Sequence, residues 1–154
     1  MTAQTDHSSA KPAPGAKGHT LLSVDAMGGD EGPAAIVAGC SLSARINPHI
    51  SFVLHGDKAQ LDALVAKHAP LRGRCEIRHA ADVVSMEDKP SHVVRTGQGT
   101  SMWSAIESVR TGEAAVAVSC GNTGALMAMS MIRLRKLPGV NRPAIAVLYP
   151  SANP

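Results

Sequence analysis

Aromatic residues are almost absent from this sequence, and Phe52, Trp103 and Tyr149 are the only three in 154 residues. Sites for single-stranded nucleic acid stack bases on aromatic side chains, and nucleic-acid-binding domains in general present a dense basic surface. The net charge here is only +3, and Lys and Arg are scattered along the chain. The sequence therefore predicts no nucleic-acid partner. Its apolar residues are mainly aliphatic, which suits helices packed closely on a sheet.

Cysteine is also scarce, and its pattern argues against two kinds of site. Cys40, Cys75 and Cys120 are odd in number, widely spaced and include no Cys-x-x-Cys pair. This pattern favours reduced thiols in a cytosolic protein over a disulfide framework or a zinc site. The histidines have no metal-ligand spacing on a helix. We therefore expect no metal and no other cofactor.

Long apolar runs are missing too. No run is long enough to cross a membrane, and residues 1–20 lack the apolar centre of a signal peptide. The sequence therefore predicts a cytoplasmic protein. Residues 1–19 are rich in Ala, Pro, Ser, Gly and Lys, which predicts a disordered tail. Residues 20–154 are expected to form part of a single α/β domain.

Apolar segments of strand length and helix length alternate after this tail. The predicted strands are residues 21–26, 50–55, 75–79, 115–119 and 144–149. The predicted helices are residues 33–46, 59–67, 101–110 and 124–136. Residues 80–100 are less regular. This alternation predicts βαβ units, and therefore a three-layer, doubly wound α/β fold with a mainly parallel sheet. Because the chain stops just after its last predicted strand, we expect a truncated domain.

Short polar residues mark the predicted ends of several helices. Asp57 is the expected N-cap of the second helix, and Ser91 is a candidate cap for a short helix in the irregular segment. Thr100 or Ser101 would cap the third helix, which Gly112 would close.

The run Gly121-Asn122-Thr123-Gly124 links a small-residue strand directly to a helix. It carries little side-chain bulk, so backbone N–H groups can approach a ligand, and the following helix N-terminus adds partial positive charge. Such a turn suits a phosphate or a developing oxyanion. A purely structural turn would look the same, because any tight strand-to-helix connection favours glycine.

A second glycine-rich connection follows the first predicted strand. Asp25 closes that strand, and Met27-Gly28-Gly29-Asp30-Glu31-Gly32-Pro33 leads into a helix. Pro33 suits the first helical position, and Asp30 and Glu31 can cap the helix N-terminus or complement its charge, with Asp30 as the expected cap. Two such turns in one α/β chain predict a ligand crevice at the carboxyl ends of the strands.

Taken in order, these motifs resemble the bacterial phosphate acyltransferase family over residues 20–150. The residues that carry the resemblance are Asp25 to Asp30, Gly32-Pro33, Arg95, Thr100 to Met102, and Gly121 to Ala125. The family transfers a fatty acyl group from acyl carrier protein (ACP) to inorganic phosphate in phospholipid synthesis. The resemblance implies an isopropylmalate/isocitrate-dehydrogenase-like fold, a homodimer and peripheral association with the inner face of the membrane. Family members are more than twice as long, which implies an N-terminal portion that is inactive by itself.

The resemblance and the turns together select the candidate site residues. Asn122 is a candidate catalytic residue that would donate its amide to an oxyanion, with turn and cap chemistry as the alternative. Asp25 is the second, either orienting a catalytic group or, as we favour, organising the Gly28-Gly29 turn. The candidate phosphate- and substrate-binding residues are Gly28, Gly29, Arg95, Thr100, Ser101, Gly121, Thr123 and Gly124.

Cys120 is the remaining reactive side chain near these motifs. A thiol at a helix N-terminus is a possible acyl-accepting nucleophile. The sequence assigns it no base, and the resembling family usually has Ala there, so we expect Cys120 only to fill a tight turn. Two other functions stay open: a phosphotransacetylase-like transferase that uses acyl-CoA, and a non-catalytic α/β module that binds a phosphate ligand.

Overall fold

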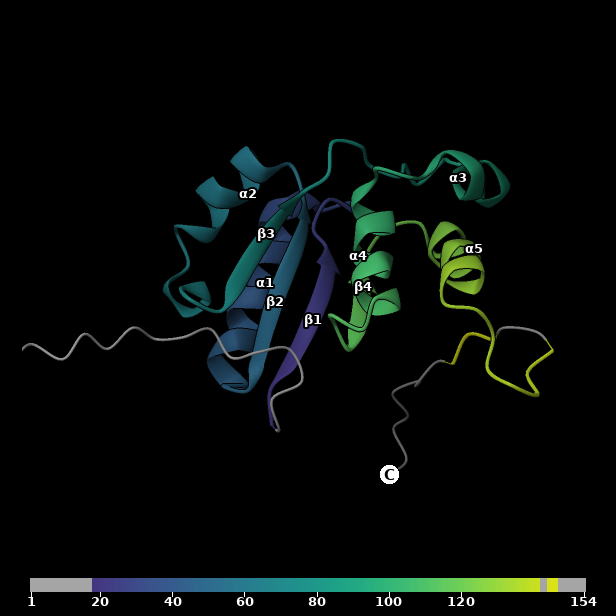
Figure 1. Cartoon of the computed structure of the whole chain (residues 1–154). Helices are drawn as coiled ribbons and strands as arrows, with labels where there is room; N and C mark the ends of the chain where they lie inside the picture. Colours follow the sequence, from purple (N-terminus) through teal and green to yellow (C-terminus); the bar gives the residue numbers. More distant parts are fainter. Residues whose placement is uncertain (1–17, 142–143, 147–154) are drawn as a thin grey trace, which may run out of the picture.

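One parallel sheet forms the centre of the computed structural model, which describes residues 18–141 and 144–146. Its strands are β1 (Thr20–Asp25), β2 (Ile50–Gly56), β3 (Cys75–His79) and β4 (Val116–Ser119), in the spatial order β3-β2-β1-β4 (Figure 1). All three strand pairs are parallel. The predicted α/β fold with a mainly parallel sheet is therefore confirmed.

Helices cover both faces of this sheet, which gives the three expected layers. The elements α1 (Gly32–Ile46), α2 (Lys58–Val65) and the short 3-10 helix η1 (Ala69–Leu71) pack on one face. On the opposite face lies α4 (Ser101–Arg110), which contacts β1, β2 and β4. The helices α3 (Pro90–Thr96) and α5 (Thr123–Arg133) pack against each other, and α5 also contacts α4.

The two faces of the sheet differ in polarity because successive side chains in a strand alternate between faces. Val24, Phe52 and Leu54 belong to the apolar core shared with α1, which also contains Val37, Cys40, Ala44 and Leu61. Ser23 and His55 are fully buried on the α4 side. A second apolar cluster joins α3, α4 and α5, and consists of Val84, Val93, Met102, Ile106, Ala125 and Met129.

His55 is held between the sheet and α4 by two hydroxyl groups. Ser23 Oγ donates to the Ala105 carbonyl at 2.9 Å and lies 2.8 Å from His55 Nε2, so Nε2 is the donor in that contact. His55 Nδ1 then accepts from Ser104 Oγ at 2.7 Å. Burial, together with the positive charge of Arg78, lowers the pKa of His55 to about 4. The imidazole is therefore neutral at pH 7.

The helix ends test the capping predictions. Asp57 accepts from the Gln60 N–H at 2.7 Å and Thr100 accepts from the Trp103 N–H at 3.2 Å, so both N-caps are confirmed. Of the two candidates for α1, Glu31 occupies the N-cap position without a side-chain capping bond, so the prediction that Asp30 caps the helix is wrong. The prediction for Ser91 is also wrong, because α3 begins at Pro90 with Lys89 as its N-cap.

The end of the chain differs from expectation as far as it is described. The last helix, α5, ends at Arg133, and Arg135 adopts a left-handed φ of 66°. Of the strand predicted over residues 144–149, residues 144–146 are in no strand, and the remainder lies outside the described residues. The tail predicted over residues 1–19 also lies outside them, apart from residues 18 and 19. No helix in the described part of the chain is long and apolar enough to cross a membrane.

Candidate functional site

The two glycine-rich turns meet at the carboxyl ends of β1 and β4. These strands are neighbours, with Asp25 in register with Ser119. The chain goes from β1 to β2 on one side and later returns to place β4 on the other side of β1. Such a reversal of strand order is where open α/β sheets bind ligands. The crevice predicted from the sequence is therefore at the switch point of this sheet.

Backbone contact between the turns explains two of the glycines. A Cβ atom on Gly28 would lie 2.9 Å from the Gly121 backbone nitrogen and 2.7 Å from Asp25 Oδ2. Gly29 has a φ of 102°, and a Cβ there would lie 3.1 Å from the Cys120 carbonyl oxygen. Side chains at either position would push the turns apart. The glycines thus bring the β1 and β4 connections together, whatever they bind.

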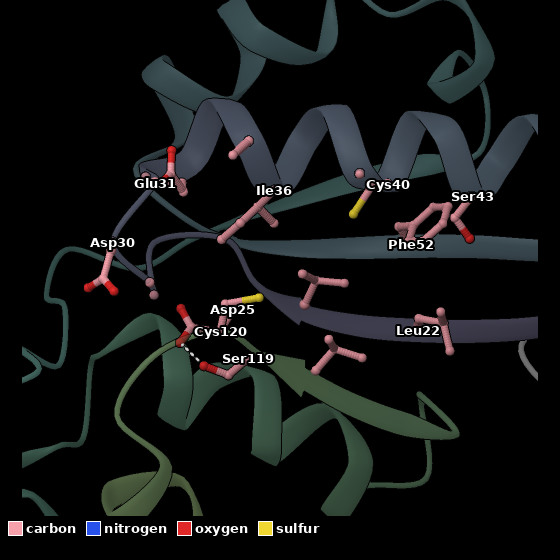
Figure 2. Close-up of a pocket in the computed structure, with 17 residues that line it drawn as sticks. Leu22, Asp25, Asp30, Glu31, Ile36, Cys40, Ser43, Phe52, Ser119 and Cys120 are labelled. Carbon is pink, nitrogen blue, oxygen red and sulfur yellow. Dashed lines mark hydrogen bonds between the residues drawn. The ribbon is translucent and has the colours of Figure 1, made fainter. Parts of the chain in front are cut away.

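Asp25 joins the two turns through Ser119. The Ser119 hydroxyl donates to Asp25 Oδ2 at 2.7 Å (Figure 2). It also accepts from the Gly121 N–H at 3.1 Å. The other carboxylate oxygen accepts from the Met27 N–H at 3.3 Å, and the side chain is 1% exposed. These contacts match the turn-organising role expected for Asp25. Ser119 was not among the predicted site residues, although its position at the end of the neighbouring strand was a usable signal.

Asn122 is the N-cap of α5, and both ends of its amide are engaged. Its carbonyl oxygen accepts from the Ala125 N–H at 3.0 Å. Its NH₂ group lies 2.9 to 3.2 Å from the carbonyl oxygens of Ser85, Met86 and Asp88. Two amide hydrogens are thus directed at a loop more than thirty residues away. Donation to an oxyanion would require one of these bonds to be released, and this role for Asn122 stays a prediction.

Thr123 and Gly124 begin α5 and have different surroundings. Thr123 is exposed in the first turn of the helix, where backbone N–H groups lack intrahelical partners. A Cβ on Gly124 would lie 2.8 Å from Pro90 Cγ. The absence of a side chain at Gly124 therefore allows the start of α3 to pack against the start of α5. Thr123 is the member of this pair available to a ligand.

Arg95, Thr100 and Ser101 lie around the end of α3 and the start of α4. Arg95 is exposed in the last turn of α3 and makes no ion pair with any residue that the structure describes. Thr100 is buried, and its hydroxyl donates to the Gly97 carbonyl at 2.7 Å. Ser101 is fully buried, and its hydroxyl has no hydrogen-bond partner in the part of the chain that the structure describes. Among the described residues, none of their side chains bonds to the two glycine turns.

A groove of about 520 Å³ extends from the crevice along α1. Its walls come from α1 on one side and the sheet on the other, with Ile36 and Cys40 facing Leu22 and Phe52 (Figure 2). The remaining apolar wall includes Val24 and Val118. Asp25, Gly28, Gly29, Ser119 and Cys120 line the end that opens on the crevice. Sequence analysis missed this groove, because it depends on how far α1 stands from β4.

The two thiols of the groove have different environments. Cys40 is buried, and burial together with the nearby Cys120 raises the pKa of its thiol to about 11. Cys120 is exposed beside the Gly29 turn. Cys40 is therefore an uncharged part of the apolar wall at pH 7. In the described part of the chain, no group of three or more His, Cys, Asp or Glu side chains is arranged to hold a metal ion.

Comparison with known protein families matches residues 20–154 to the family described as fatty acid synthesis protein. The chain belongs to this family. Its curated relatives include the phosphate acyltransferase of Roseobacter denitrificans, which is 66% identical over 153 residues, or 99% of this chain and 42% of the relative. The phosphate acyltransferase of Cereibacter sphaeroides (strain ATCC 17025 / ATH 2.4.3) is 71% identical over 137 residues, or 89% of this chain and 37% of the relative.

These comparisons confirm the resemblance drawn from the motifs. A third relative, from Paracoccus denitrificans, is 62% identical over 152 residues and is also called phosphate acyltransferase. The chain spans about two fifths of the length of these relatives and matches their N-terminal portion. The family match begins at residue 20, where β1 begins. Every predicted site residue lies within the matched region.

Proposed function

We propose that this chain forms the N-terminal part of a phosphate acyltransferase, which transfers a fatty acyl group from acyl-ACP to inorganic phosphate and yields an acyl phosphate. One observation carries the proposal: the two glycine turns are in backbone contact at the switch point of the sheet. Membership of a family whose relatives bear this name supports it. A homodimer and peripheral membrane association belong to the same proposal.

The chemistry needs little from the protein beyond position and electrostatics. Phosphate is already a charged oxygen nucleophile at neutral pH, and its attack on the thioester carbonyl produces a tetrahedral oxyanion. Backbone N–H groups at the turns and at the start of α5 would stabilise this charge. We propose that the exposed hydroxyl of Thr123, in the first turn of α5, contacts phosphate. We also propose that Asn122 either donates its amide to the oxyanion or holds the turn in position.

Negative charge near the crevice limits where phosphate can bind. Asp25 accepts bonds from Ser119 and Met27, which offset part of its charge. Asp30 and Glu31 also line the crevice end of the groove and add negative charge there. Phosphate is therefore better accommodated beside Thr123 and the N-terminus of α5 than beside the Gly28-Gly29 turn. Arg95 and the hydroxyls of Thr100 and Ser101 remain proposed phosphate contacts.

The decisive experiment measures phosphate-dependent release of ACP by the full-length protein that carries this chain. Release from acyl-ACP only when phosphate is present, with acyl phosphate as product, is the expected result. Release from acyl-CoA but not from acyl-ACP would favour the phosphotransacetylase-like alternative. Binding of phosphate without any release would favour a non-catalytic phosphate-binding module.

Two substitutions distinguish a residue that contacts the substrates from a residue that only holds the turn in position. Thr123→Val keeps the shape of the side chain and removes the hydroxyl, so it should raise the phosphate concentration needed for half-maximal rate. Asn122→Ala should reduce turnover per folded molecule by about 10² to 10³ if the amide stabilises the oxyanion. A merely structural Asn122 would instead lower the melting temperature and leave turnover per folded molecule nearly intact. Unchanged rates and phosphate dependence in both variants would contradict the site assignment.

A further inference from the structure

The groove beside α1 is continuous with the crevice and changes in character along its length. At the crevice it is lined by Asp25 and Ser119, whereas its far part is lined mainly by Leu22 and Phe52 (Figure 2). Its volume of about 520 Å³ is within the range of about 300–1,000 Å³ that is typical of small-molecule sites. A ligand that fits both parts has a polar head at the crevice and a long apolar tail.

Gly39 makes room for such a tail on the α1 side. It lies in the interior of α1, where glycine destabilises a helix relative to alanine. A Cβ at this position would have no atom within 4 Å, so no contact in the described structure requires glycine. Gly39 nevertheless lines the groove. Its missing side chain widens the groove opposite the apolar side chains of the sheet.

The charge at the mouth of the groove, where it meets the crevice, distinguishes between possible polar head groups of the ligand. Asp25 lines the mouth together with Asp30 and Glu31, and no lysine or arginine among the described residues lines the groove. A free fatty acid would place its carboxylate beside these acidic side chains without a cation to pair with it. An acyl thioester is uncharged at the carbonyl and avoids this repulsion. The favoured occupant is therefore the tail of an acyl thioester and not a free fatty acid.

The geometry points to this groove as the binding site for the acyl chain of the thioester donor. The thioester carbonyl lies at the two glycine turns, and the terminal methyl group lies near Leu22, Ser43 and Phe52. This assignment rests on the proposed function, because it places the carbonyl where phosphate would attack. It adds that Gly39 and Val118 set the length of acyl chain that the protein accepts.

Binding of uncleavable donors tests the groove directly. Octyl and hexadecyl thioethers of pantetheine would be titrated against the full-length protein that carries this chain, with palmitate as a third probe. We expect the hexadecyl thioether to bind at least tenfold more tightly than the octyl thioether, and palmitate to bind more weakly than the hexadecyl thioether. Equal affinity for the two thioethers, or tighter binding of palmitate, would overturn the assignment.

Filling the groove should remove the preference for long chains. Gly39→Leu places a side chain into open space, so it is expected to fold, and it should reduce the affinity ratio between hexadecyl and octyl thioethers at least tenfold. Val118→Phe narrows the groove from the sheet side and should act in the same direction. Ala38→Leu adds the same side chain at an exposed neighbouring position outside the groove, and should leave the ratio unchanged. An unchanged ratio in both groove variants, measured on folded protein, would overturn the assignment.

Photolabelling locates the tail and separates this inference from the proposed function. A hexadecyl thioether with a diazirine on its terminal carbon should attach to the peptide of residues 46–58, which contains Phe52, or near Leu22 and Ser43. Attachment elsewhere, or none in the full-length protein because other residues of that protein fill the groove, would overturn the assignment. Groove labelling without phosphate-dependent release of ACP would contradict the proposed function alone. Normal release with no change of chain preference in Gly39→Leu would contradict the groove alone.

Discussion

His55 is the buried ionisable side chain whose environment has the clearest consequence for stability. It is fully buried and bonded to Ser23 and Ser104 as a neutral imidazole. Its pKa falls from 6.5 to about 4 in the folded chain. Between these pH values the unfolded chain binds a proton that the folded chain does not bind, so stability decreases as the pH falls through this range.

We predict that the free energy of unfolding decreases by about 2 kcal/mol between pH 7 and pH 5 because of His55. Urea unfolding at several pH values would measure this decrease. His55→Gln should be less stable at pH 7 but should lack the decrease, whereas His92→Gln, at an exposed position on α3, should retain it. A pH dependence that is identical in His55→Gln and in the unmodified chain would show that His55 is not its source.

Cys120 tests whether the reaction passes through a covalent intermediate. Its thiol is exposed beside Gly29 and forms no hydrogen bond to a base among the described residues. We predict that Cys120→Ala in the full-length protein keeps phosphate-dependent release of ACP within about tenfold of the unmodified enzyme, whereas loss of a true nucleophile costs several orders of magnitude. Mass spectrometry after mixing with acyl-ACP provides the second measurement. An acyl thioester trapped on Cys120 would contradict the prediction.

At the scale of secondary-structure elements, two helical glycines have opposite surroundings. Gly39 in α1 has open space where a Cβ would lie, whereas Gly124 in α5 meets Pro90 of α3 at 2.8 Å. Replacement of Gly39 by alanine should therefore stabilise α1, whereas replacement of Gly124 by alanine should push α3 and α5 apart. Comparing the two alanine variants tests whether Gly124 allows α3 and α5 to pack together, and whether Gly39 leaves open space beside α1.

We predict that Gly39→Ala raises the free energy of unfolding by about 0.5–1 kcal/mol, because it removes the glycine penalty without a clash. Gly124→Ala should lower it by about 1–3 kcal/mol, because Pro90 must move. Thermal and urea unfolding would measure both values. Pro90→Ala should partly rescue Gly124→Ala, and a double-mutant cycle with no coupling energy would contradict direct packing of α3 on α5.

At the scale of the whole molecule, apolar side chains remain exposed where the described sheet ends. Within the described residues β4 pairs only with β1, and its Val116 and Val118 are 47% and 39% exposed. Met127 and Met131 on α5 are each 40% exposed. Exposed strand edges and apolar patches favour association with other chains.

We predict that the 154-residue chain associates as its concentration rises and binds an apolar fluorescent dye. Sedimentation velocity over a range of concentrations and dye fluorescence would measure both effects. Val116→Lys at the strand edge should reduce association, whereas Ala34→Lys on the exposed side of α1 should change it little. A monomer at every concentration, with a sharp cooperative melt and no dye binding, would contradict the prediction.

The sequence alone was sufficient for features that depend on neighbouring residues. The four described strands and their parallel arrangement follow from alternating apolar segments. Asp57 and Thr100 cap the helices that begin at the next residue, and each accepts from a backbone N–H three residues further on. The glycine turns after β1 and β4 were predicted from the same local pattern, as was the family resemblance. Asp30 and Ser91 were assigned wrongly as caps because several neighbouring residues offered similar local chemistry.

Only the tertiary structure decided what the candidate site residues contact. Ser119 reaches Asp25 across 94 positions of sequence, and the amide of Asn122 bonds a loop that includes Asp88, 34 positions away. Position 124 has room only for glycine because Pro90 packs against it. The groove depends on the distance between α1 and the sheet. Local propensities set the strands and turns, but contacts between distant segments depend on how the layers pack. That packing determines which polar groups are already paired and where a ligand has room.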